Sequence, residues 1–372
     1  MSIDFLIPPS STVRPPKWPS TPVGRSCLDR IRLSALRRLG PCLLILVLGW
    51  TGLASAAERT VQDLAGETVA LPAHPARIAD LWFAHNELLV MLGGAGCIRM
   101  TVDRPETTPW MFKLAPVLHQ ATQIRGQANP EALLAEGIDL AFVSSPRSAL
   151  PYRRLGIPTL AMEFQNADGL MHAVSLTADA LGSTAAQAVA RRYNQELLQV
   201  MAGLKQRLGD LTEAQRPRVL HIESLVPLRV DGGGSLIDQW IHLAGGRNAA
   251  ASVKGSKQPV DFEQVLAWQP DIIIVGASAA KIDQVAANAW WRSLPAVRQG
   301  RVYRDPLGIF PWDRYGSEFL LQLQWAAKTL HPERFRDLDM PAVAHRFYAD
   351  YFQHDLSEAD IRRMLQGLPP AS

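Results

Sequence analysis

Arginine and aromatic side chains gather in one segment of the chain that has no regular helix or strand pattern. This segment, GIFPWDRYGSE, spans residues 308–318 and contains Trp312, Arg314 and Tyr315. Aromatic rings cover apolar surface, and a guanidinium group pairs with carboxylate or catecholate oxygens. The segment therefore predicts part of a binding site for a large, flat or anionic molecule.

Other candidates for the same site lie at the ends of short apolar runs that read as strands, or in the loops that follow them. The carboxyl ends of parallel strands line the crevice of an open α/β sheet, so residues in these positions are expected to face a ligand. They are Trp82, Phe83, His85, Trp110, Arg147 and Arg229. A plainer interpretation stays open for three of them: Trp82 as a core residue, and Arg147 and Arg229 as solvated loop charges.

The nine histidines are scattered in a way that does not favour a metal site. No two of them lie four residues apart on a predicted helix with a carboxylate nearby, and the sequence has no HExxH or paired CxxC motif. We therefore predict no direct protein cage for a bare metal ion. His85 is the possible exception, since it could complete the coordination of a metal chelate that leaves one position open. Otherwise it is a structural neighbour of a helix start.

The elements that would position these residues alternate between strands and helices. Residues 77–102 read as strand, helix and strand, and residues 129–144 add a helix followed by a fully apolar strand. This alternation predicts an α/β fold with a mainly parallel sheet flanked by helices.

The same order of elements returns in the second half of the chain. Residues 261–276 match residues 129–144 at a constant offset of 132, which places Glu131 on Glu263 and Asp139 on Asp271. A match that occurs twice at a long period indicates two similar lobes rather than a solenoid.

One long helix is predicted between the two halves, over residues 184–208. Apolar residues recur every three or four positions along it: Val189, Tyr193, Leu197, Val200, Leu204 and Leu208. At about 1.5 Å per residue, the helix would be roughly 37 Å long. Thr184 and Gln187 have the spacing of a capping box at its start. Such a helix can tie two lobes together, although an ordinary surface helix would show the same periodicity.

The first 56 residues read as a cleaved export signal. They contain seven Lys and Arg and two acidic residues, followed by the apolar run LGPCLLILVLGWTGL and by Ala54-Ser55-Ala56. Small residues in this spacing are typical of a signal-peptidase site, which predicts cleavage after Ala56 and export. A membrane anchor is the alternative.

Removing this leader changes the charge and cysteine counts. The whole chain has a net charge of +3 and the leader contributes +5, so the remaining 316 residues carry about −2. This balance favours neither nucleic acid nor an anionic membrane as a partner. Because Cys27 and Cys42 lie in the leader, Cys97 is left alone and an intramolecular disulfide is not expected.

Several segments in a particular order support a family resemblance over residues 58–330. They are DLWFAHNELLVMLGG, GGGSLIDQWIHLAGGRN, FLLQLQWAAKTLHPERF, the segment around Trp312 and the twin segments that begin at Glu131 and Glu263. With them the chain resembles the helical-backbone (class III) solute-binding proteins of ABC importers, which bind ferric siderophores, haem or cobalamin.

The resemblance implies two α/β lobes joined by a rigid helix, with a ligand cleft between them. The expected parts are an N-terminal lobe over 57–166, linking helices over 167–210, a C-terminal lobe over 211–330 and C-terminal helices over 331–372 that pack back on a lobe. It also implies that Glu131 and Glu263 dock onto a permease dimer in the inner membrane. A carboxylate in the first turn of a helix is favoured by the helix dipole.

The resemblance further implies a monomeric periplasmic carrier without a cofactor of its own. A ferric siderophore best suits the aromatic and arginine candidates, while cobalamin, haem and other metallophores remain open. An exported two-lobe enzyme is the alternative of another class, but the glycines at 232–234 lack the Lys of a phosphate loop and GxSxG is absent. We therefore predict a protein that is not an enzyme. A sensor that binds no small molecule is a third class.

Overall fold

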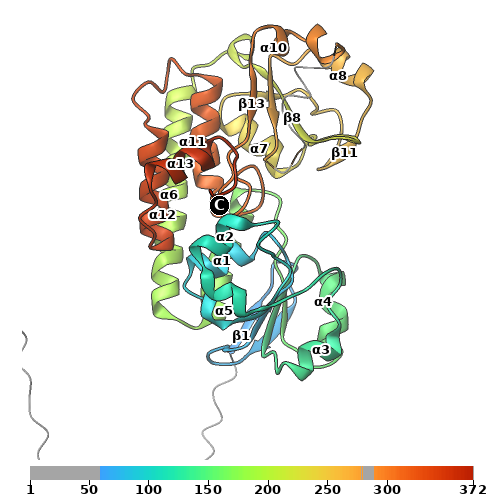
Figure 1. Cartoon of the computed structure of the whole chain (residues 1–372), viewed down its shortest axis with the longest axis vertical. Helices are drawn as coiled ribbons and strands as arrows, with labels where there is room; N and C mark the ends of the chain where they lie inside the picture. Colours follow the sequence, from blue (N-terminus) through green and yellow to red (C-terminus); the bar gives the residue numbers. More distant parts are fainter. Residues whose placement is uncertain (1–58, 278, 280–288, 372) are drawn as a thin grey trace, which may run out of the picture. The chain divides into compact units, whose positions relative to one another are not determined.

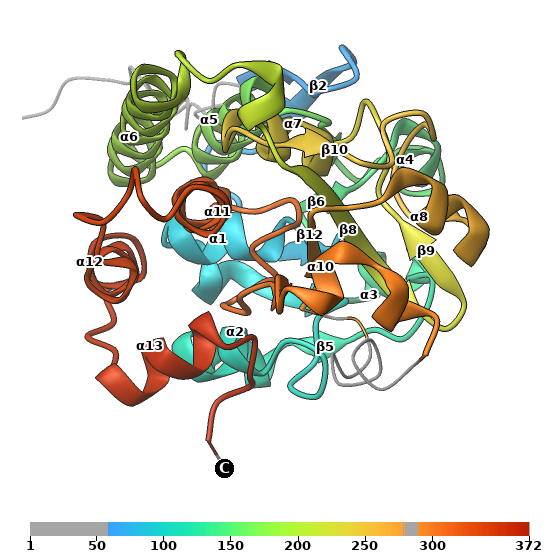
Figure 2. The same ribbon diagram turned by 90° about the horizontal axis from the view of Figure 1, so that it is seen from above.

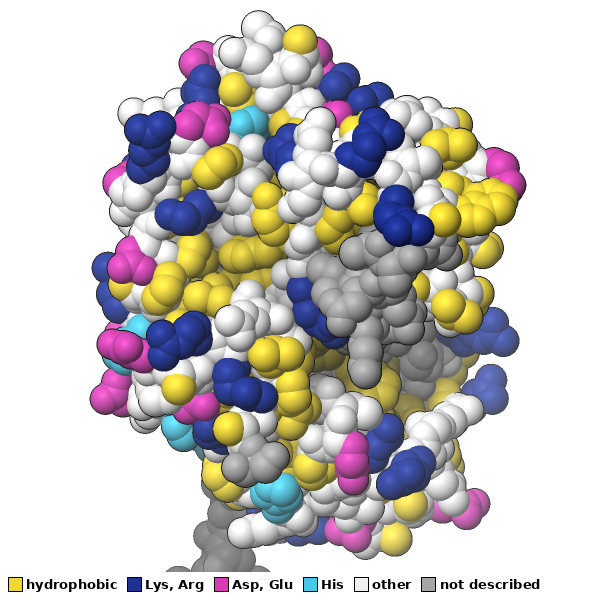
Figure 3. Space-filling view, turned by 45° about the horizontal axis from the view of Figure 1, so that its top comes forward, with side chains coloured by type: hydrophobic (Ala, Val, Ile, Leu, Met, Phe, Trp, Pro, Cys, Tyr) yellow, Lys and Arg dark blue, Asp and Glu magenta, His cyan; other side chains and the backbone are white. Residues whose placement is uncertain are grey.

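The computed structural model describes residues 59–277, 279 and 289–371. The predicted signal peptide, its cleavage point after Ala56 and both leader cysteines lie outside the described residues. Figure 1 shows two separate sheets, with α6 and the C-terminal helices running beside both of them. On the face drawn in Figure 3, basic and acidic side chains are interspersed, and hydrophobic side chains gather in a band between them.

The first sheet has five strands in the order β5-β4-β3-β6-β7, and all of its neighbouring strands are parallel. Its strands are β3 (Ile78–Asp80), β4 (Ile98–Thr101), β5 (Thr122–Gln123), β6 (Leu140–Val143) and β7 (Thr159–Ala161). The helices between them are α1 (Asn86–Met91), α2 (Pro109–Leu114), α3 (Pro130–Ala135) and α4 (Pro146–Arg153). A hairpin of β1 (Arg59–Gln62) and β2 (Thr68–Leu71) precedes the sheet. The predicted strand and helix alternation is confirmed in this half.

The second sheet is mixed, with a parallel centre and an antiparallel edge. Strand β8 pairs in parallel with β12 and β10, and β12 pairs in parallel with β13, whereas β8, β9 and β11 pair antiparallel. Its strands are β8 (Arg218–Leu225), β9 (Leu228–Val230), β10 (Arg247–Asn248), β11 (Gln258–Pro259), β12 (Ile272–Val275) and β13 (Val302–Arg304). The accompanying helices are α7 (Leu236–Leu243), α8 (Phe262–Trp268), α10 (Pro295–Arg298) and α11 (Phe319–Leu330).

The repeat seen in the sequence is a repeat of structure. Segments 129–144 and 261–276 each form a helix and a central strand, in different sheets. Asp139 accepts a hydrogen bond from the backbone N–H of Arg77 at 3.1 Å, and Asp271 accepts one from that of Arg218 at 2.8 Å. The backbone N–H of each aspartate in turn bonds to the carbonyl of the same arginine. The same aspartate–arginine contact therefore lies at the starts of two neighbouring strands in each sheet.

Two helices, α5 (Ala167–Leu181) and α6 (Thr184–Leu208), connect the sheets. The turn between them uses Gly182 at φ 66°, a left-handed conformation that favours glycine. The N-cap of α6 is Ser183, whose hydroxyl accepts from the N–H of Ala186 at 3.3 Å. The predicted capping box at Thr184 is therefore wrong, and Gln187 instead donates to Asp179 at 2.9 Å. The bounds of the long helix are as predicted.

The C-terminal helices α12 (Met340–Phe352) and α13 (Glu358–Leu365) return from the second sheet to the first. Helix α12 packs on α11 and on α1. Beyond it, Lys113 of α2 lies 2.8 Å from Asp360 of α13, and Nε1 of Trp110 donates to the carbonyl of Leu368 at 2.9 Å. In Figure 2, α13 lies beside α2. These contacts form a second connection between the two halves, in addition to α6.

Candidate functional site

The carboxyl ends of the first sheet surround a hollow of about 440 Å³. Residues at or just after the ends of three strands line it, namely Leu81, Val102, Val143 and Ser144, together with Arg147 of α4. Hollows of about 470, 590 and 860 Å³ lie at α6–α7, at β10 and at α12–α13. None of those three is lined by the carboxyl ends of parallel strands, so size alone does not identify the site.

An aromatic cluster of Trp82, Phe164 and Tyr315 lies where the carboxyl-end segments of the two sheets meet. Trp82 follows β3, Phe164 follows β7, and Tyr315 belongs to the segment after β13. Ring centroids are 5.9 Å apart for Trp82 and Phe164, 5.8 Å for Trp82 and Tyr315, and 5.4 Å for Phe164 and Tyr315. Trp82 and Tyr315 are half-buried. The cluster therefore joins both halves and still presents aromatic surface.

Sequence reasoning found two members of this cluster and missed Phe164. Phe164 is buried, yet it lies three residues beyond the end of β7, so the rule that selected Trp82 would also have selected it. Next to it, Gln165 accepts a hydrogen bond from the hydroxyl of Tyr315 at 3.4 Å. The predicted candidate Phe83 lies nearby in sequence and is 45% exposed.

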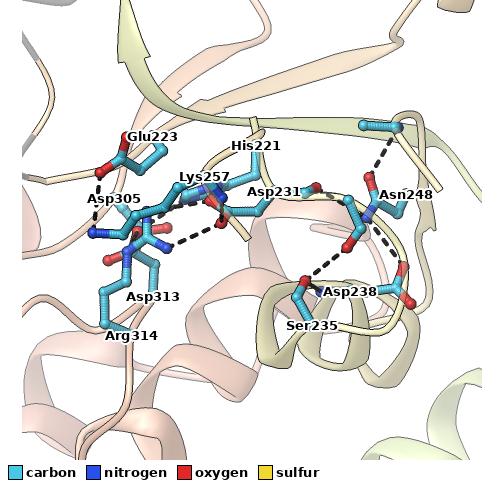
Figure 4. A network of polar contacts seen from close by, with 12 residues as sticks. His221, Glu223, Asp231, Ser235, Asp238, Asn248, Lys257, Asp305, Asp313 and Arg314 are labelled. Carbon is cyan, nitrogen blue, oxygen red and sulfur yellow. Dashed lines mark hydrogen bonds and ion pairs between the residues drawn. The ribbon is translucent and has the colours of Figure 1, made fainter. Parts of the chain in front are cut away.

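Next to Tyr315 in the chain, Arg314 belongs to a charged network with His221, Asp231 and Asp313 (Figure 4). The two ring nitrogens of His221 lie 2.8 Å from Asp231 and 2.9 Å from Asp313. Arg314 approaches Asp231 to 3.2 Å and Asp313 to 3.3 Å. Its side chain is only 11% exposed. The guanidinium is thus paired within the protein, which differs from the predicted role of Arg314 as a partner of ligand oxygens.

The charged network stabilises its own ionised forms. Burial alone would lower the pKa of His221, but the hydrogen bond with Asp231 and the charges of Asp231 and Asp313 raise that pKa to about 9. Burial would raise the pKa of Asp231, yet the hydrogen bond with His221 and the charge of Arg314 hold it below its ordinary value. Next to them, burial and the charge of Asp313 raise the pKa of Asp305 well above its ordinary value.

His85 is not at a cleft mouth, so the prediction that it could bind the metal of a chelate is wrong. Its side chain is fully buried. Nδ1 lies 2.6 Å from Asp80 and Nε2 lies 2.8 Å from the hydroxyl of Thr177, so both ring nitrogens are occupied. The ring stacks on Phe142 at 4.2 Å. His85 therefore connects β3, β6 and α5 inside the core.

Trp110 and Trp312 are also core residues, which corrects their prediction as ligand contacts. Both are fully buried. Nε1 of Trp110 bonds to the carbonyl of Leu368, and Nε1 of Trp312 to the hydroxyl of Tyr348 at 3.2 Å. Buried tryptophans in this setting hold segments together through packing and one hydrogen bond.

The two remaining arginine candidates differ in whether their guanidinium groups have a partner within the protein. Arg147 is exposed at the hollow of the first sheet. No other residue in the described part of the chain is its hydrogen-bond or ion-pair partner. Arg229 is half-buried and donates to the carbonyl of Lys257 at 2.9 Å. Arg147 therefore offers an available cation, whereas Arg229 supports the β9–β11 edge.

A buried pair of carboxyl groups, Glu87 and Glu318, connects α1 to the segment 308–318. Glu87 bonds to the hydroxyl of Ser317 and accepts from the N–H of Glu318 at 3.1 Å. Burial and then the charge of Glu318 raise the pKa of Glu87 well above its ordinary value. Burial raises the pKa of Glu318 to about 7 in spite of hydrogen bonds that lower it. Sequence reasoning missed this pair, because no pattern marks contacts between residues so far apart.

Glycines on either side make room for these carboxyl groups. A Cβ at Gly316 would lie 2.0 Å from Oε2 of Glu87, and a Cβ at Gly308 would lie 1.8 Å from Oε1 of Glu318. Only glycine fits at either position without a shift of the carboxylate. The segment 308–318 is thus fitted closely to α1 and α11.

The matching family model carries the description "Periplasmic binding protein" and covers residues 142–307. The molybdate-binding protein MolA of Haemophilus influenzae is 24% identical over 350 residues, covering 85% of this chain and 97% of that protein. Its structure with bound molybdate has a TM-score of 0.73 at 22% identity, covering 81% of this chain and 99% of that one.

Two further solved structures are similar. A periplasmic solute-binding protein of Veillonella parvula has a TM-score of 0.71 at 23% identity, with coverage of 83% of this chain and 96% of that one. CeuE of Helicobacter pylori with bound Ni(II) has a TM-score of 0.68 at 18% identity, with coverage of 83% and 100%. The chain has the helical-backbone (class III) periplasmic binding protein fold. The predicted resemblance and the two-lobe α/β fold are confirmed.

In this periplasmic binding protein fold, the twin glutamates occupy equivalent places. Glu131 lies in the first turn of α3 and Glu263 in the first turn of α8. Both are exposed, and among the described residues neither carboxylate has a hydrogen-bond or ion-pair partner. The helix starts are fixed by Asn129 and Asp261, whose side chains accept from backbone N–H groups. Across the described residues, no helix is long and apolar enough to cross a bilayer.

Proposed function

We propose that this protein is the periplasmic solute-binding component of an ABC importer, exported by a cleaved signal peptide, and that it captures a metal chelate, namely a ferric siderophore. The observation that carries the proposal is the aromatic cluster, because it joins residues from the carboxyl ends of both sheets. Trp82 and Tyr315 are half-buried there, so their rings can cover the apolar parts of a chelate.

Arg147 supports an anionic solute. It is exposed at the hollow of the first sheet and has no partner among the described residues. A guanidinium in this position pairs with carboxylate or catecholate oxygens of a chelate. Arg314 contributes indirectly, since its ion pairs hold the segment that presents Tyr315.

Molybdate is the second candidate solute. The relative MolA is named as molybdate-binding and was solved with molybdate. The hollow beside Arg147 is also lined by Ser144, Ser148 and Gln127. Hydroxyl and amide donors next to one guanidinium suit a small oxyanion. Such a solute would not need the aromatic cluster.

Calorimetric titration distinguishes these solutes. We expect a ferric catecholate siderophore to bind in a 1:1 ratio, and molybdate, haem, cobalamin and nickel to bind more weakly. Arg147→Ala should weaken binding of the siderophore about 10-fold. Arg154→Ala removes an exposed arginine from the end of the same helix and should leave affinity unchanged. If molybdate alone binds tightly, molybdate and not a siderophore is the solute. Turnover of an ester or phosphoester would favour the enzyme alternative.

We further propose that Glu131 and Glu263 dock onto the permease dimer in the inner membrane. Two exposed anions, one on each lobe, allow a two-fold symmetric partner with basic residues to hold both lobes at once. Glu131→Ala combined with Glu263→Ala should abolish solute uptake by cells and leave solute affinity unchanged. Glu136→Ala, at the other end of α3, is the control and should transport normally. Loss of solute affinity in the double variant would refute the docking role.

A further inference from the structure

Three buried side chains in the second half of the molecule converge on one point. His221 lies on β8, Asp305 follows β13 directly, and Asp313 belongs to the segment 308–318. One ligand-type atom from each residue lies within 4.8 Å of the others. All three side chains are at most 1% exposed. A histidine nitrogen with two carboxylate oxygens is a donor set that transition metals accept.

Several polar atoms at this point have no hydrogen bond. Among the described residues, they are Nε2 of His221, Oδ1 of Asp305 and both carboxylate oxygens of Asp313. Nε2 of His221 and Oδ2 of Asp313 lie 2.9 Å apart as an ion pair, so Oδ1 of Asp305 and Oδ1 of Asp313 are the two atoms of this set with neither a hydrogen-bond nor an ion-pair partner among the described residues. Buried polar atoms are nearly always partnered, since each one left bare costs about 1–3 kcal/mol. Two carboxylate oxygens left bare at one buried point, next to a histidine nitrogen, indicate a shared ligand.

The other atoms of the same side chains are held from outside the cluster. Nδ1 of His221 lies at hydrogen-bond distance, 2.8 Å, from Asp231, which directs Nε2 toward Asp305 and Asp313. Nε2 of Gln322 donates to Oδ2 of Asp305 at 3.0 Å and leaves Oδ1 free. Metal-binding histidines commonly have their second nitrogen held by a carboxylate in this way.

Among the described residues, the guanidinium of Arg314 opposes a cation at this point. Its Nε lies 3.3 Å from Oδ2 of Asp313. Three carboxyl groups, Asp231, Asp305 and Asp313, surround this point, so a divalent cation that displaces the protons of His221 and Asp305 leaves the site without net charge. The charge of the site is therefore compatible with an ion of charge two at this position.

We propose that His221, Asp305 and Asp313 bind one divalent transition-metal ion. The nitrogen and the low number of oxygen ligands favour Zn²⁺, Mn²⁺, Fe²⁺ or Ni²⁺ over Ca²⁺ and Mg²⁺, which prefer cages of six or more oxygens. The ion would join β8, the end of β13 and the segment that carries Tyr315. This site is independent of the solute proposal. It was not expected from the sequence, because His221 and Asp305 are 84 positions apart.

Metal binding to the full chain tests the site directly. After removal of metals with a chelator, calorimetric titration with Zn²⁺ should show one bound ion per chain, and Co²⁺ should produce a visible absorption band. Asp305→Asn removes a ligand charge at constant size and should weaken Zn²⁺ binding at least 100-fold and remove the Co²⁺ band. His345→Asn is the control for a surface ion, because His345 lies 2.8 Å from Asp355 at the surface. It should change neither result.

A second variant keeps the test decisive if Asp305→Asn does not fold. Gln322→Ala keeps all three ligands but frees Asp305, and we expect it to weaken Zn²⁺ binding 10- to 100-fold. The proposal is overturned if the wild-type chain binds no ion, if neither variant weakens binding, or if His345→Asn abolishes binding.

Discussion

The two sheets start from the same repeated unit and end differently at their carboxyl edges. At the first sheet, Trp82, Phe83 and Arg147 are exposed or half-buried, and Arg147 is not paired with any described residue. At the second sheet, Arg314 is paired with Asp231 and Asp313, and His221 lies between the same two carboxylates. One repeat has therefore produced an open surface in the first lobe and a closed ionic network in the second. The difference shows that equivalent positions in a repeat need not share a role.

The largest effect should come from breaking the charged network of the second lobe. Asp231→Ala leaves the buried His221 and Arg314 with only Asp313 as a partner, so we expect a loss of about 3–5 kcal/mol in the free energy of unfolding. Urea denaturation measures this loss. Asp337→Ala removes an exposed partner of Arg207 and should cost far less, because solvent screens exposed ion pairs. If both variants lose the same free energy of unfolding, the charged network does not stabilise the fold more than an exposed ion pair does.

The next effect concerns pH and the carboxyl pair that joins the lobes. An acid whose pKa is higher in the folded protein binds more protons when folded, so its stability contribution is complete at low pH and is lost as the pH rises. For Glu318 this loss runs from about 4.5 to about 7, and Glu87 is shifted in the same direction. We expect Glu318 alone to lower the free energy of unfolding by about 3 kcal/mol over this range, and Glu87 to add to this fall.

Glu87→Gln sharpens this prediction. Its amide oxygen can still accept from Ser317 and from the N–H of Glu318, so the packing is preserved. The variant loses one of the two shifted carboxyl groups, and its stability should fall by about half as much between pH 4.5 and 7. Urea denaturation at several pH values measures both slopes. Identical slopes would mean that the pair does not control the pH dependence.

A smaller effect is expected from Tyr315, the residue of the second lobe that reaches the aromatic cluster. Tyr315→Ala removes the ring that contacts Trp82 and Phe164 and should weaken solute binding about 10-fold, or about 1.4 kcal/mol. Tyr315→Phe keeps the ring and should stay within about threefold of wild type. Fluorescence titration measures both affinities. If Tyr315→Ala binds as well as Tyr315→Phe, the ring plays no part.

The smallest effect should be that of Arg229. Its guanidinium donates to the carbonyl of Lys257, so Arg229→Ala should change solute affinity by less than about 0.5 kcal/mol. Affinity in this variant and in Arg147→Ala can be compared by the same titration. A larger loss at Arg229 than at Arg147 would reverse the proposed difference between the two lobes.

Periodic and local features were predictable from the sequence. The bounds of α6 and the helix-strand repeat depend on residues close together in the chain, and the structure has them as expected. The carboxyl-end rule also placed Trp82 and Tyr315 correctly at the junction of the sheets. Their role as solute contacts stays a proposal.

Burial and long-range pairing were not predictable in the same way. His85, Trp110 and Trp312 lie in irregular segments, where sequence carries no period to tell an inward side chain from an outward one. The pairs of Arg314 with Asp231 and of Glu87 with Ser317 join residues separated by 83 and 230 positions. Only the folded chain brings such groups together.

The central claim is that one solute is held where the two lobes meet, by residues of both. The most direct measurement is calorimetric titration of a ferric catecholate siderophore into wild type, Arg147→Ala of the first lobe and Tyr315→Ala of the second. The account predicts one solute per chain in wild type and weaker binding in each variant. Full affinity in both variants would contradict it.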